Sequence, residues 1–173
     1  MQDVKLFDNR LLFKDELVSE TDMPTMFSNK RIVMFGLPGA FTPTCSGKQL
    51  PAYEDMYEQF IATDKVDAVY CVSVNDHFVM NAWGKDLGIQ KVKLIPDGNG
   101  ALTRQLGMLV DKPVQQFGLR SWRYSSYVVN GIVKKMFIEP GINNMSDDED
   151  PYEESTPEKI LDYVKSLWTK TLP

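Results

Sequence analysis

Apolar and polar positions along this chain alternate between two periods, and the alternation predicts an α/β protein. Short continuous apolar runs, which are typical of buried strands, lie at residues 32–35, 66–74 and 92–95. Between these runs, helical spacing and helix start and stop signals predict helices over residues 43–63 and 76–88. This order of strands and helices is typical of a sheet covered by helices.

Two β-rich runs in the second half of the chain predict an antiparallel pair. They cover residues 122–129 and 132–138 and are joined at Asn130-Gly131, a dipeptide typical of two-residue hairpin turns. Near the N-terminus, short apolar pieces alternate with charges over residues 5–22, which predicts edge strands or a hairpin. We therefore expect a central mixed β-sheet flanked by helices, with an N-terminal β extension.

The remaining segments are predicted as two helices, a loop and an irregular connection. A short helix covers residues 101–106, and residues 110–118 form the irregular connection. The strongly acidic residues 146–154 should form a solvated loop. An amphipathic helix then begins at Thr156-Pro157 and should cover the sheet.

Length and composition favour one globular domain that spans residues 1–173. The chain is 43% hydrophobic and 25% charged, which is enough to bury a sizeable core. A net charge of −5, with Lys and Arg scattered along the chain, argues against a nucleic-acid partner. The N-terminus lacks the pattern of a secretory signal and no apolar run is long enough to span a bilayer. We therefore expect a cytoplasmic protein without a membrane partner.

The cysteine and histidine content limits the chemistry further. Cys45 and Cys71 are the two cysteines, so the chain has no disulfide framework. The single histidine, His77, excludes a metal site built from several histidines. We expect no bound metal.

The candidate chemistry lies between Pro38 and Cys45, directly after the first buried strand. Pro38 and Gly39 end that strand, Thr42 reads as a helix N-cap and Pro43 as the first helical residue. Cys45 then falls in the first turn, where backbone N–H groups lack intrahelical acceptors and the helix dipole adds partial positive charge. Both effects favour a thiolate over a thiol. The alternative is a small apolar cysteine packed beneath a loop.

The spacing Pro38-xxx-Thr42-xx-Cys45 resembles the active-site motif of peroxiredoxins, and the longer string from Pro38 to Ser46 resembles the type-II, or class-five, subfamily. Further resembling stretches follow in the family's order: Ser73-Val74-Asn75-Asp76, Phe78-Val79, Trp83, Arg123-Tyr124-Ser125 and Val128-Val129. The resemblance implies a thioredoxin-like fold. It also implies a cofactor-free, thiol-dependent peroxidase that reduces hydrogen peroxide and alkyl hydroperoxides.

The resemblance also implies roles for residues of the motif. Cys45 would be the peroxidatic nucleophile, whose thiolate attacks the terminal peroxide oxygen and becomes a sulfenic acid. Thr42 would hydrogen-bond the peroxide, and Pro38 would shield the thiolate from water. The backbone N–H groups of Thr44 and Cys45 would contact the substrate.

The charged positions of the site are selected by the resemblance rather than by spacing. Arg123 precedes an aromatic-Ser pair, as the family's active-site arginine does, and would stabilise the thiolate and the transition state. Arg120 is the alternative. Two positions depart from the common pattern: Gln49 stands where many members have His, and Lys85 where Arg is frequent. Either change would alter pH dependence or hydroperoxide preference.

Cys71 decides the class of mechanism. It lies in the apolar run at residues 66–74, where the burial habit of free cysteine favours a structural role over a resolving one. No cysteine follows it, so the chain resembles a one-Cys peroxiredoxin whose Cys45 sulfenic acid is reduced by glutathione or glutaredoxin. One alternative is a two-Cys peroxidase with Cys71 resolving and thioredoxin as reductant. Another is a redox-responsive binding protein.

The subfamily resemblance further implies a homodimer packed near the active-site loops. Phe78 and Trp83 are compatible with such a contact and equally compatible with the core.

Overall fold

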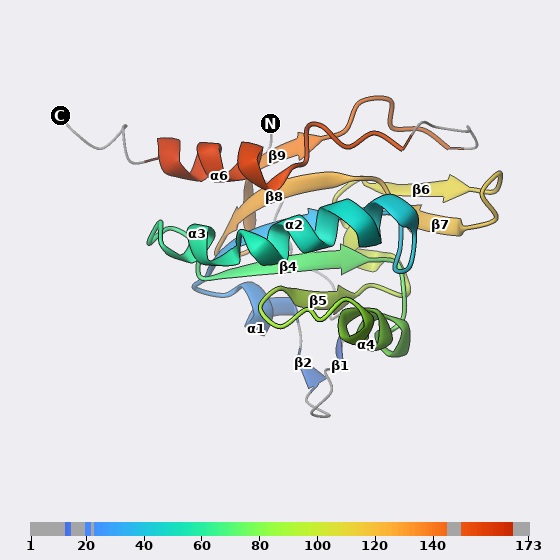
Figure 1. Cartoon of the computed structure of the whole chain (residues 1–173), viewed down its shortest axis with the longest axis horizontal. Coiled ribbons are helices and arrows are strands. Elements are labelled where there is room, and N and C mark those ends of the chain that lie inside the picture. Colours follow the sequence, from blue (N-terminus) through green and yellow to red (C-terminus); the bar gives the residue numbers. More distant parts are fainter. Residues whose placement is uncertain (1–12, 15–19, 22, 145–149, 168–173) are drawn as a thin grey trace.

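A five-stranded mixed sheet forms the centre of the fold (Figure 1), in a computed structural model that describes residues 13–14, 20–21, 23–144 and 150–167. The order of the strands is β5-β4-β3-β8-β9. They are β3 (Arg31–Gly36), β4 (Ala68–Ser73), β5 (Lys93–Pro96), β8 (Tyr124–Val129) and β9 (Ile132–Ile138). Strand β4 pairs in parallel with β3 and β5, whereas β8 pairs antiparallel with β3 and β9. The predicted mixed sheet is confirmed.

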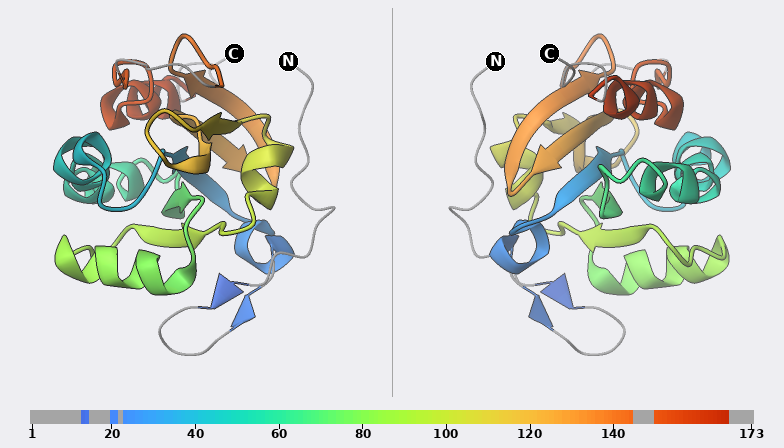
Figure 2. Two further views of the ribbon diagram at one scale, coloured as in Figure 1. Left: turned by 90° about the vertical axis from the view of Figure 1, so that its right-hand side faces the viewer. Right: turned by 90° about the vertical axis from the view of Figure 1, so that its left-hand side faces the viewer.

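Helices cover both faces of this sheet (Figure 2). One face packs against α2 (Leu50–Asp55), α3 (Tyr57–Ile61), α4 (His77–Asp86) and α6 (Pro157–Ser166). The other packs against α1 (Met23–Phe27) and α5 (Ala101–Gln105). Because the central strands are covered on both sides, they read in the sequence as continuous apolar runs.

Aromatic packing fixes α2 on the sheet. Phe35 of β3 stacks on Tyr53 of α2, with ring centroids 3.8 Å apart and an interplanar angle of 10°. Tyr53 in turn donates a hydrogen bond to the carbonyl of Ser155 at 2.7 Å, which ties α2 to the segment that precedes α6. Buried aromatic rings of this size contribute strongly to core stability.

The predicted helix over residues 43–63 is not continuous. A π-helical turn, η1 (Cys45–Gln49), precedes α2, and the chain leaves helical geometry at Met56, where φ is −90° and ψ is 1°. The wide turn ends just ahead of Pro51, which lacks the N–H that a regular α-helix would need at this point. The other predicted helices are confirmed as α4, α5 and α6, and Asp76 caps α4 by accepting a hydrogen bond from Val79 N–H at 2.9 Å.

The predicted irregular connection at residues 110–118 is confirmed for residues 113–117, which form a turn, and wrong at its two ends, which belong to strands. An antiparallel ladder joins β6 (Leu109–Lys112) to β7 (Gly118–Ser121). Its strands are four residues long, and charged residues interrupt their apolar pattern, so they carry little sequence signal. At the N-terminus, β1 (Phe13–Lys14) and β2 (Glu20–Thr21) pair antiparallel, which confirms the predicted β extension there. Other parts of the predicted 5–22 extension lie outside the described residues.

The hairpin predicted at Asn130-Gly131 is confirmed. Both residues have positive φ, 49° and 72°, the combination that a tight turn between β8 and β9 requires. A register shift between Tyr127 and Val128 adds a bulge to this pair.

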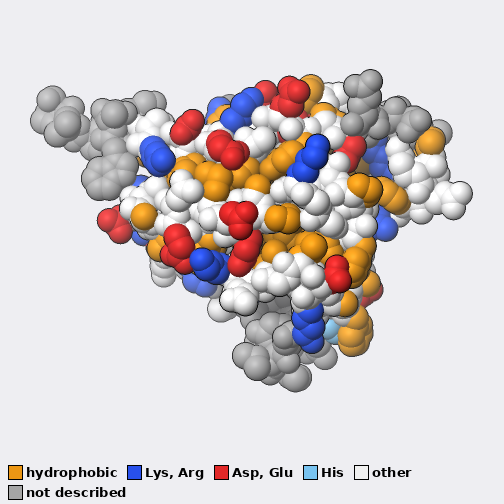
Figure 3. All heavy atoms as spheres, in the orientation of Figure 1, with side chains coloured by type: hydrophobic (Ala, Val, Ile, Leu, Met, Phe, Trp, Pro, Cys, Tyr) orange, Lys and Arg blue, Asp and Glu red, His pale blue; other side chains and the backbone are white. Residues whose placement is uncertain are grey.

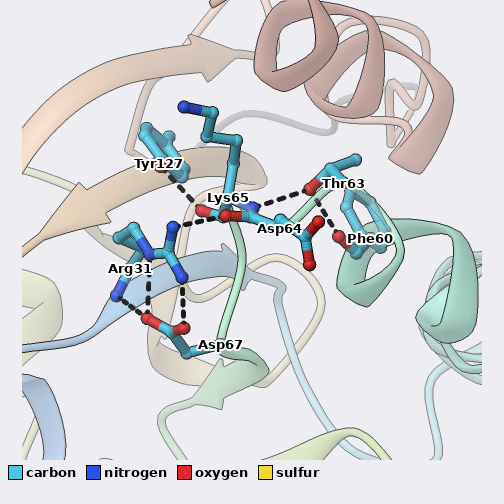
Figure 4. Close-up of polar contacts among 7 residues, drawn as sticks. All are labelled: Arg31, Phe60, Thr63, Asp64, Lys65, Asp67 and Tyr127. Atoms are coloured by element: carbon cyan, nitrogen blue, oxygen red, sulfur yellow. Dashed lines mark hydrogen bonds and ion pairs between the residues drawn. The ribbon is translucent and has the colours of Figure 1, made fainter.

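An arginine fork holds the connection between α3 and β4 against the start of β3 (Figure 4). Arg31 donates to both carboxylate oxygens of Asp67, from Nη2 at 2.7 Å and from Nε at 3.1 Å, and also donates to the carbonyl of Asp64. Side-chain hydrogen bonds from Arg31 hold the pKa of Asp67 below its usual range.

The face that carries α2, α3 and α6 shows acidic and basic side chains interspersed with hydrophobic ones (Figure 3). Neither sign of charge gathers into one patch on that face. Within the described ranges, no helix is long and apolar enough to cross a membrane. In the same ranges, no cluster of three or more His, Cys, Asp or Glu side chains could hold a metal ion.

Candidate active site

The loop that leaves β3 delivers Cys45 to the first turn of a helix. Asn75, beyond the end of β4, accepts a hydrogen bond from the backbone N–H of Ala40 at 3.0 Å and so anchors this loop. Phe41 has a φ of 61°, and Pro43 begins the helix. The amide of Ser46 donates to the carbonyl of Thr42 at 2.9 Å, which places Thr42 at the N-cap position. The predicted start of the helix is confirmed.

The hydroxyl of Thr42 faces back into the loop. It donates its proton to the carbonyl of Gly39 at 2.7 Å, a local bond that the cap interpretation did not predict. A hydroxyl has one proton and two lone pairs. With the proton committed to Gly39, Thr42 presents an acceptor to any group that donates from the adjacent cavity.

The π-helical turn brings Cys45 and Gln49 onto one side. Leu50 N–H bonds to the carbonyl of Cys45, five residues back, so the turn is wider than an α-helical one. Residues four apart therefore lie closer to one line than they would in an α-helix. Both Cys45 and Gln49 are fully buried. Next to them, Trp83 of α4 donates from its indole N–H to Ser46 Oγ at 3.0 Å and holds the turn against the core.

Arg123 directly precedes β8, the strand that pairs with β3, and its side chain contacts this turn. Its side chain is only 2% exposed, and Nη1 lies 3.5 Å from Cys45 Sγ. The same Nη1 donates to Gln49 Oε1, and Nη2 donates to the carboxylate of Asp150. Burial alone would lower the pKa of Arg123, but the charges of Cys45 and Asp150 oppose this effect and the net result is a raised pKa. The arginine remains a cation.

Arg120 lies nearby without touching the sulfur by hydrogen bond. Its Nε donates to the carbonyl of Phe117 at 3.0 Å, and its Nη1 donates to the carbonyl of Val74 at 3.4 Å. Burial lowers the pKa of Arg120 and the charge of Cys45 opposes that change. Of the two arginines considered from sequence, Arg123 is therefore the one in contact with Cys45, and Arg120 adds a more distant positive charge.

A cavity of about 170 Å³ opens beside these groups. Its lining combines proline rings, a hydroxyl, an indole and an ion pair, contributed by Pro38, Thr42, Pro43, Trp122, Arg123 and Asp150. The cavity brings together Pro38, Thr42 and Arg123, three residues that the sequence assigned to one site.

Cys71 lies in β4, inside the same hydrophobic cluster as Cys45. It is fully buried, and neither cysteine is in a disulfide. Burial, together with the nearby charge of Cys45, raises the pKa of the Cys71 thiol well above its usual value. Such a thiol is a weak nucleophile at neutral pH.

Residues of the C-terminal segment were missed from sequence. Residues 146–154 were predicted to be solvated, but Asp150 binds Arg123 and the ring of Tyr152 lies 5.8 Å from the Arg123 guanidinium carbon. Asp150 is exposed, as predicted, but its ion pair with Arg123 was not predicted, and Tyr152 is half-buried, so the prediction is wrong there. Residues 146–149 lie outside the described residues. A run of acidic residues carries no signal that one member has a buried cation as its partner. The sequence marks Gln49 only as a departure from the common His and does not predict its hydrogen bond with Arg123.

Comparison with known proteins agrees with this geometry. The Redoxin family model matches residues 8–155. The chain is 52% identical over 146 residues to peroxiredoxin y4vD of Sinorhizobium fredii, covering 84% of this chain and 77% of that protein. It is 48% identical over 139 residues to the hybrid peroxiredoxin hyPrx5 of Haemophilus influenzae, covering 80% of this chain and 55% of that protein.

A solved structure extends the agreement to three dimensions. The antioxidant protein of Plasmodium falciparum, described as a 1-Cys peroxiredoxin, superimposes with a TM-score of 0.81 and 40% identity. The superposition covers 86% of this chain and 83% of that one. With Cys45 at a helix start, Arg123 against its sulfur and a helix-covered mixed sheet beneath them, the chain belongs to the peroxiredoxins, in their type-II (class-five) subfamily with the thioredoxin-like fold.

Proposed function

We propose that Cys45 reduces hydrogen peroxide and alkyl hydroperoxides and is then recycled by glutathione or glutaredoxin in a one-Cys mechanism. The observation that carries the proposal is the buried guanidinium of Arg123, 3.5 Å from Cys45 Sγ and beside a cavity of about 170 Å³. A fixed cation next to the sulfur stabilises the thiolate and the negative charge that develops on the departing oxygen.

In the first step the Cys45 thiolate attacks the terminal oxygen of ROOH. A sulfur–oxygen bond forms, the O–O bond breaks, and the leaving alkoxide takes a proton, which gives Cys45–SOH and ROH. Thr42 orients the peroxide by accepting a hydrogen bond from it, since its own proton is held by Gly39. The backbone N–H groups of Thr44 and Cys45 contact the substrate, and Pro38 keeps water from the sulfur.

In the second step a thiol R′SH attacks Cys45–SOH, which forms a mixed disulfide and releases water. A second thiol then displaces Cys45 as a thiol and leaves as R′S–SR′. The burial and raised pKa of Cys71 support an external reductant over an internal one. The Plasmodium falciparum relative, named a 1-Cys peroxiredoxin, supports the same mechanism.

The test compares two recycling systems with two cysteine variants. Peroxide consumption is measured with glutathione plus glutaredoxin and, separately, with thioredoxin plus its reductase. We expect rapid turnover only in the first mixture, none for Cys45→Ser, and most of the wild-type rate for Cys71→Ala. Two results together would assign Cys71 as the resolving cysteine. One is loss of turnover in Cys71→Ala, and the other is a wild-type mass lower by two protons after one equivalent of peroxide, as a Cys45–Cys71 disulfide requires. Single oxidation without turnover would favour a redox-responsive binding protein.

We also propose a homodimer that packs near the active-site loops. Phe78 and Phe41 support it, because their side chains are 74% and 54% exposed beside these loops. Trp83 is fully buried, so of the two aromatic residues considered from sequence only Phe78 can contribute to such a surface. Sedimentation at micromolar concentration should give a dimer for the wild type and a monomer for Phe78→Asp. A wild-type monomer would retire the proposal.

A further inference from the structure

Arg123 is a buried cation that needs a counter-ion throughout the catalytic cycle. Its side chain is 98% buried, and removing a charge from water is costly unless the charge is paired and hydrogen-bonded. One candidate partner is Cys45, which lies 3.5 Å from Nη1. In the proposed reaction, however, the sulfur is anionic only before oxidation, because the sulfenic acid and the mixed disulfide are both neutral.

Asp150 supplies the charge that does not change. Its carboxylate accepts from Nη2, the amino group on the other side of the guanidinium from the one that meets Cys45 and Gln49. The ring of Tyr152 lies beside the same guanidinium, 5.8 Å from its central carbon. The guanidinium is therefore hydrogen-bonded through both amino groups, from Nη1 to Gln49 of the π-helical turn and from Nη2 to Asp150 of the C-terminal segment.

One residue, Glu139, fixes the segment that carries Asp150. Its Oε1 accepts hydrogen bonds from the backbone N–H groups of Glu153, Glu154 and Ser155, at 3.0, 2.8 and 2.7 Å, and from Ser155 Oγ at 2.8 Å. The backbone N–H of Glu139 bonds to the carbonyl of Arg123 at 3.1 Å. The same residue thus sets the position of Arg123 and of the segment that reaches it.

We infer that Asp150 is a positioning residue of the peroxidatic site, which keeps the Arg123 fork paired and aimed at Cys45 while the charge of the sulfur changes. This inference rests on the proposed peroxidase function and deepens it. Asp150 makes no hydrogen bond to the sulfur; its carboxylate lines the cavity and pairs with Arg123. It acts through Arg123.

The backbone at Asp150 makes a clean substitution available. Its φ is 49°, in the left-handed region that Asp and Asn tolerate better than most residues. Asp150→Asn therefore removes the charge with little change in shape or backbone preference. Asp67→Asn is the matched control, because Asp67 also pairs with an arginine fork and is 37% exposed against 45% for Asp150, but it lies at the start of β3 and β4 rather than at the site.

The experiment measures the second-order rate constant for Cys45 oxidation by hydrogen peroxide at neutral pH, in the fully reduced full-length protein. We expect about a tenfold lower rate constant for Asp150→Asn. Asp150→Glu keeps the carboxylate, and its rate constant should come within about threefold of the wild-type value. The control Asp67→Asn should have the wild-type rate constant.

Three results would overturn the inference: a wild-type rate constant in Asp150→Asn, an equal loss in Asp67→Asn, or a loss in Asp150→Glu as large as in Asp150→Asn. Failure of the wild type to be oxidised at all would instead overturn the proposed function. That failure is distinguishable, because it is seen before any variant is compared.

Discussion

Cys45 and Arg123 lie 78 positions apart in the sequence, yet Nη1 of the arginine is 3.5 Å from the sulfur. The pairing of β3 with β8 explains the contact. Gly36, the last residue of β3, pairs with Tyr124, the first residue of β8, in an antiparallel register. The chain leaving β3 toward Cys45 and the residue just before β8, Arg123, therefore meet at one edge of the sheet. The register of two strands sets the position of the charge beside the Cys45 sulfur.

Arg123 is hydrogen-bonded through both of its amino groups, Nη1 and Nη2, so we predict that lysine cannot replace it. Arg123→Lys keeps the positive charge but loses the planar fork that reaches Cys45, Gln49 and Asp150 together. We expect kcat/KM for hydrogen peroxide to fall by about 100-fold or more, a loss typical of removing one preorganised donor. Steady-state assays of peroxide consumption by the wild type and the variant measure this change in kcat/KM. Arg104→Lys, an exposed arginine on α5, is the control and should retain wild-type kinetics. Equal losses in both variants would contradict this account.

Gly36 is predicted to tolerate no side chain. A Cβ at this position would lie 2.2 Å from Cε1 of Tyr124 and 2.8 Å from Oγ of Ser121, both buried. Overpacking of this kind costs about 1–3 kcal/mol, so thermal unfolding of Gly36→Ala should show a clearly lower Tm. Gly47→Ala is the control, because a Cβ there meets nothing within 4 Å and alanine favours helical geometry. Its Tm should be equal or higher.

The ion pair between Arg31 and Asp67 predicts a pH-dependent contribution to stability. Because the bond from Arg31 lowers the pKa of Asp67 in the folded state, the pair stabilises the fold above the unfolded-state pKa and loses this effect as pH falls through the folded-state pKa. Both side chains are more than a third exposed, so solvent screening limits the contribution to about 1 kcal/mol or less. Urea unfolding of Asp67→Asn should show a deficit at pH 7 that vanishes near pH 2. A deficit that persists there would exclude the charge as its cause.

Cys71 is predicted to resist thiol reagents in the folded protein. Burial removes it from solvent and raises the pKa of its thiol, so little thiolate exists at neutral pH. Mass spectrometry of Cys45→Ser after incubation with iodoacetamide should show no added group without denaturant and one added group in guanidinium chloride. Rapid labelling of the folded variant would mean that β4 opens more readily than its burial indicates.

The strands and the position of Cys45 in the first turn of a helix were predictable because each has a local signal. The run at residues 32–35 is continuous and apolar, Asn130-Gly131 is a specific turn dipeptide, and Pro43 marks a helix start two residues before Cys45. All three predictions are confirmed.

The features that escaped prediction depend on contacts between distant segments. Asp150 belongs to an acidic stretch that reads as solvated, and only its approach to Arg123 gives it a partner. Glu139 reads as an ordinary residue at the end of a strand until residues 153–155 fold over its carboxylate. The two short strands β6 and β7 stabilise each other and have little periodicity of their own.

The π-helical turn at Cys45–Gln49 makes the site depend on residue count as well as on residue identity. The bond from Leu50 to Cys45 encloses one residue more than an α-helical turn, and that extra residue keeps Cys45 and Gln49 both in contact with Arg123. Gly47 is exposed and a Cβ there would meet nothing within 4 Å, so deleting it would remove no side-chain contact of its own. The shortened turn would still lead into α2. It would be rotated about the helix axis, however, and this rotation would move the Cys45 sulfur away from the guanidinium. In this part of the chain, a change in length is more damaging to chemistry than to folding.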